Sequence, residues 1–155
     1  MPIESAGLLL YRKRHAVEVF LIHMGGPFWA TKDNAAWSIP KGVVGPDEKP
    51  VVAARREFQE ETGFKVDGEL LALGRFRQNS SKNLSVWAVE GDCDPDKLLS
   101  TTFAMEWPPK SGRMQEFPEA DRGDWFAKAT ALEKIVRGQR VVLESFYAKI
   151  LSARK

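Results

Sequence analysis

The chain has 155 residues, 43% hydrophobic and 28% charged, a composition ordinary for a soluble globular protein of one domain. The net charge is only +2 and Lys and Arg are dispersed, so duplex nucleic acid is not indicated as a partner. Apolar runs such as Val17 to Ile22 are too short to span a bilayer, and the N-terminus does not resemble a secretory signal. Cys93 is the only cysteine, which excludes an internal disulfide, and the scattered His15 and His23 argue against a zinc cluster. We therefore expect a cytoplasmic protein.

The N-terminal part of the sequence predicts a hairpin followed by a short strand. Ser5 to Tyr11 and Val17 to His23 are rich in residues that favour strands, and they flank a basic turn. A loop containing glycine and proline comes next. A short strand around Trp37 to Ile39 is then broken by Pro40. These segments predict the beginning of a β-sheet.

A helix should begin between Asp47 and Pro50, because proline is tolerated in a first helical turn. Gly63 is expected to end it, because glycine readily adopts the left-handed conformation found after many helices. The face toward the core is predicted by three apolar residues at helical spacing, Val51, Ala54 and Phe58.

The second half of the chain continues the mixture of strands and helices. Further strands are expected at Leu70 to Phe76, Leu84 to Val89 and Trp125-Phe126. Thr101 to Pro118 contains Pro and Met and is expected to be a surface loop. From about Leu132 to Leu151 the chain should be helical, with a break near Gly138. With no repeat or linker, residues 1–155 are expected to form a single α+β domain.

Three carboxylates are crowded near the end of the predicted helix, at Glu57, Glu60 and Glu61. On a helix they span an arc of roughly 100°, and Glu57 meets the other two at spacings where like charges repel by a few tenths of a kcal/mol. The last turn of a helix also favours cations rather than anions. A positive partner is therefore expected. Because the ligands would be carboxylate oxygens, Mg²⁺ or Mn²⁺ is favoured over zinc or copper.

Three glutamates near a helix end more often form a solvated face, but here they belong to a longer pattern. Gly42 is followed after five residues by Glu48, and after seven more by Arg56-Glu57. The whole stretch is G-x5-E-x7-R-E-F-x-E-E-x-G-F, which resembles the signature of the Nudix hydrolases. One departure is the aromatic residue at Phe58 and Phe64, where the family usually has an aliphatic one. The polar positions are all present.

The resemblance implies an α+β Nudix fold, in which a mixed β-sheet is sandwiched between helices (α/β/α). It implies hydrolysis of a nucleoside diphosphate linked to another group, with Mg²⁺ or Mn²⁺ as cofactor. It also implies metal ligands at Glu57, Glu60, Glu61 and the carbonyl of Gly42. Glu57 or Glu60 would accept a proton from the attacking water. Arg56 belongs with Glu57 and Glu60 to the expected catalytic residues. Together with Glu48 it also matches the family's pair of residues that braces the loop against the helix.

Two kinds of residue outside the glutamate cluster are candidates for substrate binding. Lys41, in Pro40-Lys41-Gly42, resembles the lysine of Nudix members that act on polyphosphate chains, where it neutralises an extra phosphate; an ordinary exposed lysine is the alternative. Trp29 and Trp107 lie in predicted loops and are candidates to contact a base. The other tryptophans are expected in the core, namely Trp37, Trp87 and Trp125.

Many Nudix enzymes use one more acidic residue outside the signature. Glu116, Glu119 and Asp121 all precede Trp125. Glu119 lies six residues before that tryptophan, a spacing seen in the nucleotide-sanitising branch, and is our first candidate for a further metal ligand. Glu116 is the next candidate, and a charged loop without function is the alternative.

Three functions are compatible with these patterns. The first is a pyrophosphohydrolase of a dinucleoside polyphosphate or a nucleoside triphosphate. The second is the same chemistry on a nucleotide sugar, ADP-ribose or an RNA 5′ end. Pro40-Lys41-Gly42 argues against ADP-ribose, and the lack of a basic stripe with aromatic residues argues against RNA. The third, a non-catalytic Nudix binding or regulatory protein, is expected to lack a signature glutamate, and none is missing here. The identity of the linked group and the oligomeric state are not indicated.

Overall fold

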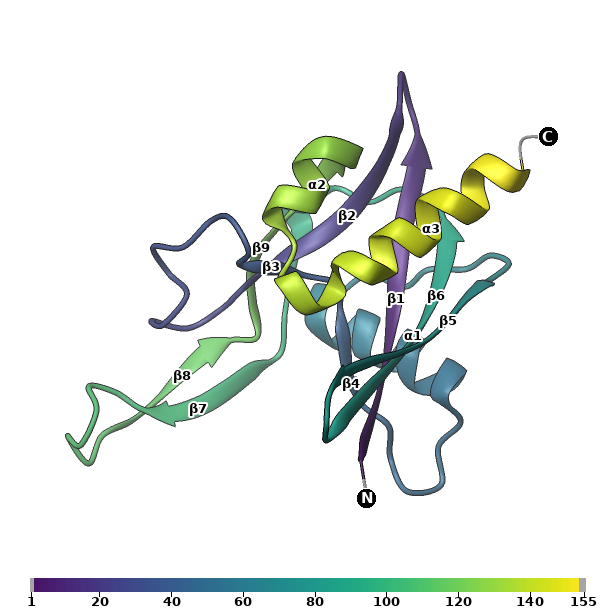
Figure 1. Cartoon of the computed structure of the whole chain (residues 1–155). Helices are drawn as coiled ribbons and strands as arrows, with labels where there is room; N and C mark the ends of the chain where they lie inside the picture. The colour runs from purple at the N-terminus through teal and green to yellow at the C-terminus, as the bar shows by residue number, and fades with distance from the viewer. Residues whose placement is uncertain (1, 154–155) are drawn as a thin grey trace.

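The computed structural model describes residues 2–153 (Figure 1). Met1, Arg154 and Lys155, which the expected domain includes, lie outside the described residues. The strands are β1 (Ile3–Lys13), β2 (Val17–Met24), β3 (Trp37–Ser38), β4 (Lys41–Val43), β5 (Leu71–Asn79), β6 (Lys82–Glu90), β7 (Thr102–Glu106), β8 (Met114–Pro118) and β9 (Ala120–Ala127). The helices are α1 (Pro50–Thr62), α2 (Lys128–Lys134) and α3 (Arg140–Ala153), with short 3₁₀ turns at Pro95–Lys97 and Arg137–Gln139.

Among the described residues, seven strands form one mixed sheet. Its main order is β3-β2-β1-β6-β5, while β4 pairs with β1 and β9 pairs with β2. β1 and β6 are parallel, and the other pairs in this sheet are antiparallel. β1 is long enough to pair with β4 at Ser5↔Val43 and with β2 at Tyr11↔Val19. The start of the sheet, including the predicted hairpin, is therefore as expected.

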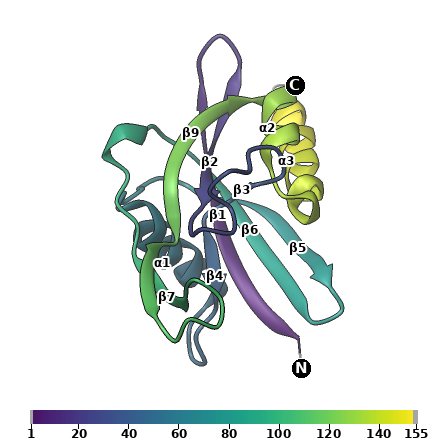
Figure 2. The same cartoon turned by 90° about the vertical axis from the view of Figure 1, so that its left-hand side faces the viewer.

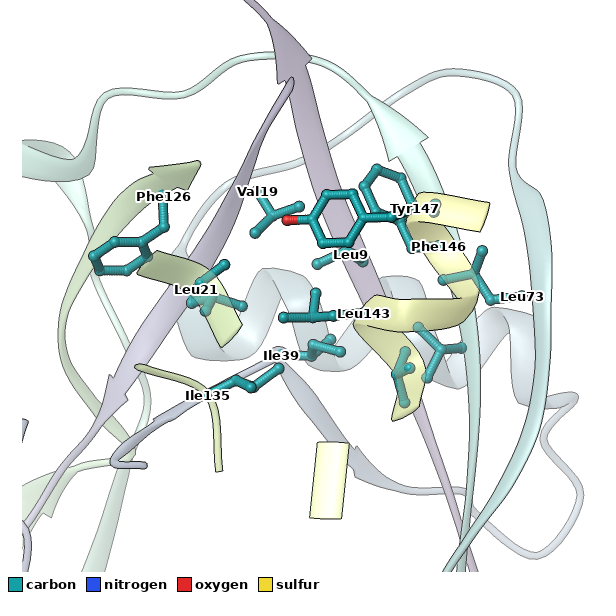
Figure 3. Close-up of a cluster of buried hydrophobic side chains, with 14 of the residues drawn as sticks. Leu9, Val19, Leu21, Ile39, Leu73, Phe126, Ile135, Leu143, Phe146 and Tyr147 are labelled. Atoms are coloured by element: carbon teal, nitrogen blue, oxygen red, sulfur yellow. The ribbon is translucent and has the colours of Figure 1, made fainter. Parts of the chain in front are cut away.

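Helices cover both faces of the sheet, so the expected α/β/α arrangement is confirmed (Figure 2). Side chains along β1 alternate between the two layers, as strand geometry requires. Leu8 and Leu10 pack in the core beneath α1, together with Phe58. Leu9 packs in the core beneath α3, and Figure 3 shows this cluster, with Leu143 and other side chains of α3 directed at the sheet.

Helix α1 has the boundaries that its sequence predicts. Pro50 begins the helix, and Gly63 follows it with a φ of 78°, its N–H donating to the carbonyl of Gln59. A positive φ of this size suits glycine because other residues place a Cβ too close to the backbone. Ala54 and Phe58 are buried as expected, whereas Val51 is half-buried. The fold thus fixes the helix end where the glutamates lie.

The prediction of a surface loop over Thr101 to Pro118 was wrong, because β7 and β8 pair there as a hairpin. The rings of Phe103 and Phe117 contact each other within it, with centroids 6.1 Å apart. β7 alternates between exposed and half-buried residues, with Phe103 and Met105 on the covered side, whereas only Phe117 of β8 is partly covered. The hairpin projects from the body of the protein (Figure 1).

The C-terminal helical stretch is broken near Gly138 as expected, but helical structure begins earlier, at Lys128. Trp37 and Trp125 are buried, in agreement with their predicted place in the core. Trp87 is half-buried and packs against the core under α1.

Candidate active site

Arg56 and Glu48 brace the loop after β4 against α1. Nε and Nη2 of Arg56 donate to the two carboxylate oxygens of Glu48 at 2.8 and 2.9 Å, a bidentate arrangement. Nη2 also donates to the carbonyl of Val43 at 3.2 Å, and Glu48 accepts the N–H of Gly45 at 3.0 Å. The hydrogen bonds from Arg56 lower the pKa of Glu48 to about 2. These contacts hold the loop that follows Gly42 in one position relative to the helix.

Arg56 is also the counter-charge of two of the crowded glutamates. Its Nη1 donates to Glu57 at 2.8 Å and to Glu60 at 3.1 Å. The positive partner that the sequence predicted is thus supplied in part by the neighbouring side chain. Glu57 is well covered, with 16% of its side chain exposed, while Glu60 retains 43%. Glu60 is therefore the one of the two with more access to solvent.

Gly42 lies directly against the carboxylate of Glu57. A Cβ placed on Gly42 would be 2.0 Å from Cδ of Glu57, closer than two such atoms can approach. Gly42 pairs with Ala6 of β1, which fixes its position in the sheet. The lack of a side chain at this residue allows Glu57 to rest on the backbone of β4.

Glu61 is a largely buried carboxyl group at the same end of α1. It accepts the backbone N–H of Lys41 at 2.9 Å. Burial raises the pKa of Glu61 to about 8, and the negative charges of Glu57 and Glu119 act in the same direction. A buried carboxylate with this environment is stabilised by a nearby cation, so it suits a metal ligand.

Glu119 lies in the connection between β8 and β9, and its backbone is held on both sides. Its N–H donates to the carbonyl of Thr101 at 2.8 Å, and its carbonyl accepts the N–H of Gly25 at 2.9 Å. Burial and then the charge of Glu57 raise the pKa of Glu119, while Lys41 opposes them. Glu116 is instead exposed on β8, opposite Ala104. This electrostatic coupling favours Glu119 over Glu116 as the further ligand.

The available donors fit a hard divalent cation, since all are oxygens: the carboxylates of Glu57, Glu60, Glu61 and Glu119, and the carbonyl of Gly42. Within residues 2–153, however, no three His, Cys, Asp or Glu side chains are already grouped to hold an ion. Two of the carboxylates, those of Glu57 and Glu60, are paired with the guanidinium of Arg56.

A cavity of about 200 Å³ contains two of the candidate substrate-binding residues. Trp29 and Lys41 line it, together with Lys82 and Asn83 of β6. Lys82 and Asn83 were not identified from the sequence, because isolated polar residues at the start of a strand carry no recognisable pattern. Trp107 lies next to β7, near the turn of the exposed hairpin, and does not line this cavity.

A more open hollow of about 710 Å³ lies beside the C-terminal half of the signature helix. It is lined by Arg56 and Glu60 and by Leu99, Ser100 and Thr101. The segment from Leu99 to Thr101 also caps α1, since Leu99 and Thr101 donate backbone N–H groups to the carbonyls of Thr62 and Glu60. The exposed face of Glu60 is thus open to solvent and to a ligand.

A polar pair between the buried His23 and the partly exposed Asp121 was also missed by sequence reasoning. Nδ1 of His23 lies 2.8 Å from Oδ1 of Asp121. The contact occupies the Asp121 carboxylate, which was the third acidic candidate before Trp125. The two residues are 98 positions apart, so only the pairing of β2 with β9 brings them together.

Comparison with known proteins identifies the class that this fold and site define. The family described as NUDIX domain matches residues 1–146, so the chain belongs to the Nudix family. Membership confirms the fold and the pyrophosphohydrolase class of enzyme that the signature predicted. Nudix hydrolases generally need a divalent metal ion.

Relatives with established names are hydrolases of phosphoric anhydrides. An RNA pyrophosphohydrolase of Photobacterium profundum is 28% identical over 85% of this chain and 79% of its own length. The asymmetrical bis(5′-nucleosyl)-tetraphosphatase of Sus scrofa is 29% identical over 69% of this chain and 79% of its own length. A C. elegans Ap4A hydrolase structure has a TM-score of 0.65 at 22% identity, covering 97% of this chain and 98% of that one, and shows the shared fold.

Within residues 2–153, no helix is long and apolar enough to cross a membrane.

Proposed function

We propose that this protein is a pyrophosphohydrolase that uses Mg²⁺ or Mn²⁺ and cleaves a polyphosphate-containing nucleotide, either a dinucleoside polyphosphate or a nucleoside triphosphate. The observation that carries the proposal is the carboxylate group at the end of α1, where Glu57 rests on Gly42 and Glu61 is buried beside Lys41. Clustered carboxylates raise the free energy of the folded state when no cation is bound. A cation bound there would contact the phosphate groups of a substrate.

The proposed ligands are Glu57, Glu60, Glu61, Glu119 and the carbonyl of Gly42. When bound, the ion supplies charge neutralisation at phosphorus and lowers the pKa of an attacking water. Glu57 or Glu60 is the proposed general base, since a carboxylate beside the bound ion can accept a proton from the attacking water. Arg56 keeps these carboxylates in place and, through Glu48, fixes the loop that presents Gly42.

The preference for a polyphosphate is supported by the place of Lys41. Its backbone N–H is bonded to Glu61, so its side chain begins at the edge of the carboxylate group. The same residue lines the cavity with Trp29 and Lys82. Two lysines line this cavity, which favours a substrate with phosphates beyond the bond that is cleaved. Trp29 is the proposed base contact there, and Trp107 is retained as a second one from the hairpin.

A second candidate substrate is the 5′ end of RNA. It is favoured by the similarity to an RNA pyrophosphohydrolase, which extends over 85% of this chain. A nucleotide sugar or ADP-ribose remains the alternative with less support, since such substrates carry only two phosphates. We further propose that residues 1–155 form a single Nudix domain and that the protein is cytoplasmic, the latter because its one cysteine leaves no internal disulfide to form.

A substrate panel tests the proposal. The purified protein is incubated with Mg²⁺ or Mn²⁺ and diadenosine tetraphosphate, a nucleoside triphosphate, ADP-ribose or a 5′-triphosphorylated RNA, and the products are separated by chromatography. We expect the highest kcat/KM with one of the first two substrates. A preference for ADP-ribose or for RNA would contradict the polyphosphate-nucleotide proposal, and no turnover of any substrate would contradict the enzymatic one. The Glu57→Gln variant controls for a contaminating hydrolase.

A further inference from the structure

His23, the last but one residue of β2, is completely buried. Its Nδ1 lies 2.8 Å from a carboxylate oxygen of Asp121 on β9. Its Nε2 lies 2.6 Å from the backbone carbonyl of Lys32, in the loop Gly25–Ala36. The ring packs edge-on against Trp37, with centroids 5.2 Å apart. One buried side chain thus connects a strand of the sheet with the loop next to the cavity.

Both partners of the His23 ring are acceptors. A carbonyl oxygen has no hydrogen to donate, and an ionised carboxylate has none either. Each ring nitrogen therefore has one partner, Asp121 at Nδ1 and the carbonyl of Lys32 at Nε2, so the ring is held between β9 and the loop.

The carbonyl that His23 holds belongs to a segment that carries the candidate base contact. The backbone N–H of Lys32 donates to the carbonyl of Trp29 at 2.9 Å. The ammonium of Lys32 lies 3.7 Å from the ring centre of Phe28 and 5.1 Å from that of Trp29. The contact of His23 with the carbonyl of Lys32 therefore also fixes the turn that contains Trp29. Trp29 in turn lines the cavity that also contains Lys41.

We propose that His23 is a positioning residue: its buried ring links β9 to the Gly25–Ala36 loop and so places Trp29 for the substrate. The part that concerns substrate rests on the function proposed above, whereas the link itself does not. Because His23 acts on the loop and not on the carboxylates of α1, its removal should weaken substrate binding and leave the chemical step intact.

The first test is spectroscopic and needs no substrate. In the ¹⁵N-labelled protein the ring nitrogen signals of His23 are compared with those of the exposed His15. The Asp121→Asn variant changes the partner of Nδ1, so the ring nitrogen signals of His23 should shift while those of His15 stay. The indole N–H signal of Trp29 should shift in the same variant. An unchanged Trp29 signal in Asp121→Asn would overturn the proposal.

The second test separates positioning from a general loss of stability. Kinetics are measured for the parent, His23→Gln, Asp121→Asn, Trp29→Ala and the His23→Gln/Trp29→Ala double variant, with His15→Gln as the matched control. We expect His23→Gln and Asp121→Asn to raise KM about tenfold with kcat little changed. In the double variant the loss should be close to that of Trp29→Ala alone, because His23 acts through Trp29.

Additive losses in the double variant, or a fall in kcat with KM unchanged, would overturn the proposal. Should His23→Gln fail to fold, Asp121→Asn supplies the same comparison, because its side chain is partly exposed and the change conserves its shape. If the protein hydrolyses none of the substrates, the proposed function fails, while the nitrogen signals of His23 and the shift of Trp29 still decide the structural link.

Discussion

Gly42 and Glu57 are in contact across two elements: a side chain on Gly42 would place its Cβ 2.3 Å from each carboxylate oxygen of Glu57. The contact joins β4, which carries Gly42, to the signature helix. Both residues belong to the proposed metal site, so their contact connects the β-sheet to the proposed catalytic residues of the helix. It also explains why a glycine is found at a position where the backbone itself has no unusual torsion angle.

Gly42→Ala should therefore inactivate the enzyme without unfolding it. The added methyl collides with the flexible end of Glu57, which can swing away, so the fold survives while the carboxylate is displaced. We expect kcat to fall by about 10²-fold or more, in the range found when a catalytic base is lost. The matched control is Gly45→Ala, where the nearest atom is 3.4 Å away and activity should persist. An active Gly42→Ala enzyme would contradict the proposed role of this contact.

Divalent metal should stabilise the protein. The proposed ligands Glu57, Glu60 and Glu61 lie together on α1, and an ion that binds only the folded state stabilises it by mass action. An ion at 100 times its dissociation constant adds about 2.7 kcal/mol to the free energy of unfolding. Calorimetric titration and the melting temperature with Mg²⁺ and Mn²⁺ measure the effect. The Glu57→Gln/Glu61→Gln variant should show neither binding nor a shift, whereas Glu69→Gln, at an exposed position, should behave as the parent.

Glu48, which holds the loop, should respond differently to loss of its charge than the proposed catalytic residues Glu57 and Glu60. Glu57→Gln and Glu60→Gln keep the shape of the side chain, so the fold should persist while kcat falls by about 10²–10⁴-fold. Glu48→Gln weakens the bidentate contact with Arg56 and should mainly lower the melting temperature, with a smaller effect on kcat. Turnover and thermal unfolding of the three variants provide the comparison. Parent-like rates for both Glu57→Gln and Glu60→Gln would show that the base lies elsewhere.

Stability of the metal-free protein should depend on pH through Glu61. Its pKa is raised from 4.5 to about 8 by burial, so the folded protein holds this proton where the unfolded chain releases it. The resulting stabilisation is full below pH 4.5 and is lost as the pH rises through 8, with a slope of at most about 1.4 kcal/mol per pH unit. Urea unfolding of the parent and of Glu61→Gln, with chelator present, measures this difference. A difference that does not change with pH would contradict the assignment.

The Lys41→Ala variant should lose more kcat/KM with substrates that have longer phosphate chains than with substrates that have two phosphates. A charge-assisted contact is worth about 1.5–3 kcal/mol, which is one to two decades in kcat/KM if it is felt in the transition state. The loss should be large for diadenosine tetraphosphate and a nucleoside triphosphate and small for ADP-ribose, which has two phosphates. Lys65→Ala, at an exposed position, is the control. An equal loss with all three substrates would contradict the role of Lys41 while leaving the family assignment unchanged.

Much of the site is local in the sequence, and the sequence therefore predicts it. The signature runs from Gly42 to Phe64, and its glutamates share one helix whose ends are set by Pro50 and Gly63. Within such a segment the spacing of residues determines which side chains are neighbours. The expected hairpin, the helix and the family could be predicted from these patterns for the same reason.

Other features depend on contacts between distant segments, and only the tertiary structure decided them. The pairing of β2 with β9 brings Asp121 to His23, and the strand connection after Pro118 places Glu119 where the charge of Glu57 acts on it. The β7–β8 hairpin was missed because its strands are short, only Phe117 of β8 is partly covered, and the prolines of this stretch favour a loop. Side-chain direction is also decided by packing, since Arg56 can reach Glu48, Glu57 and Glu60 together only when the loop after β4 folds back onto α1.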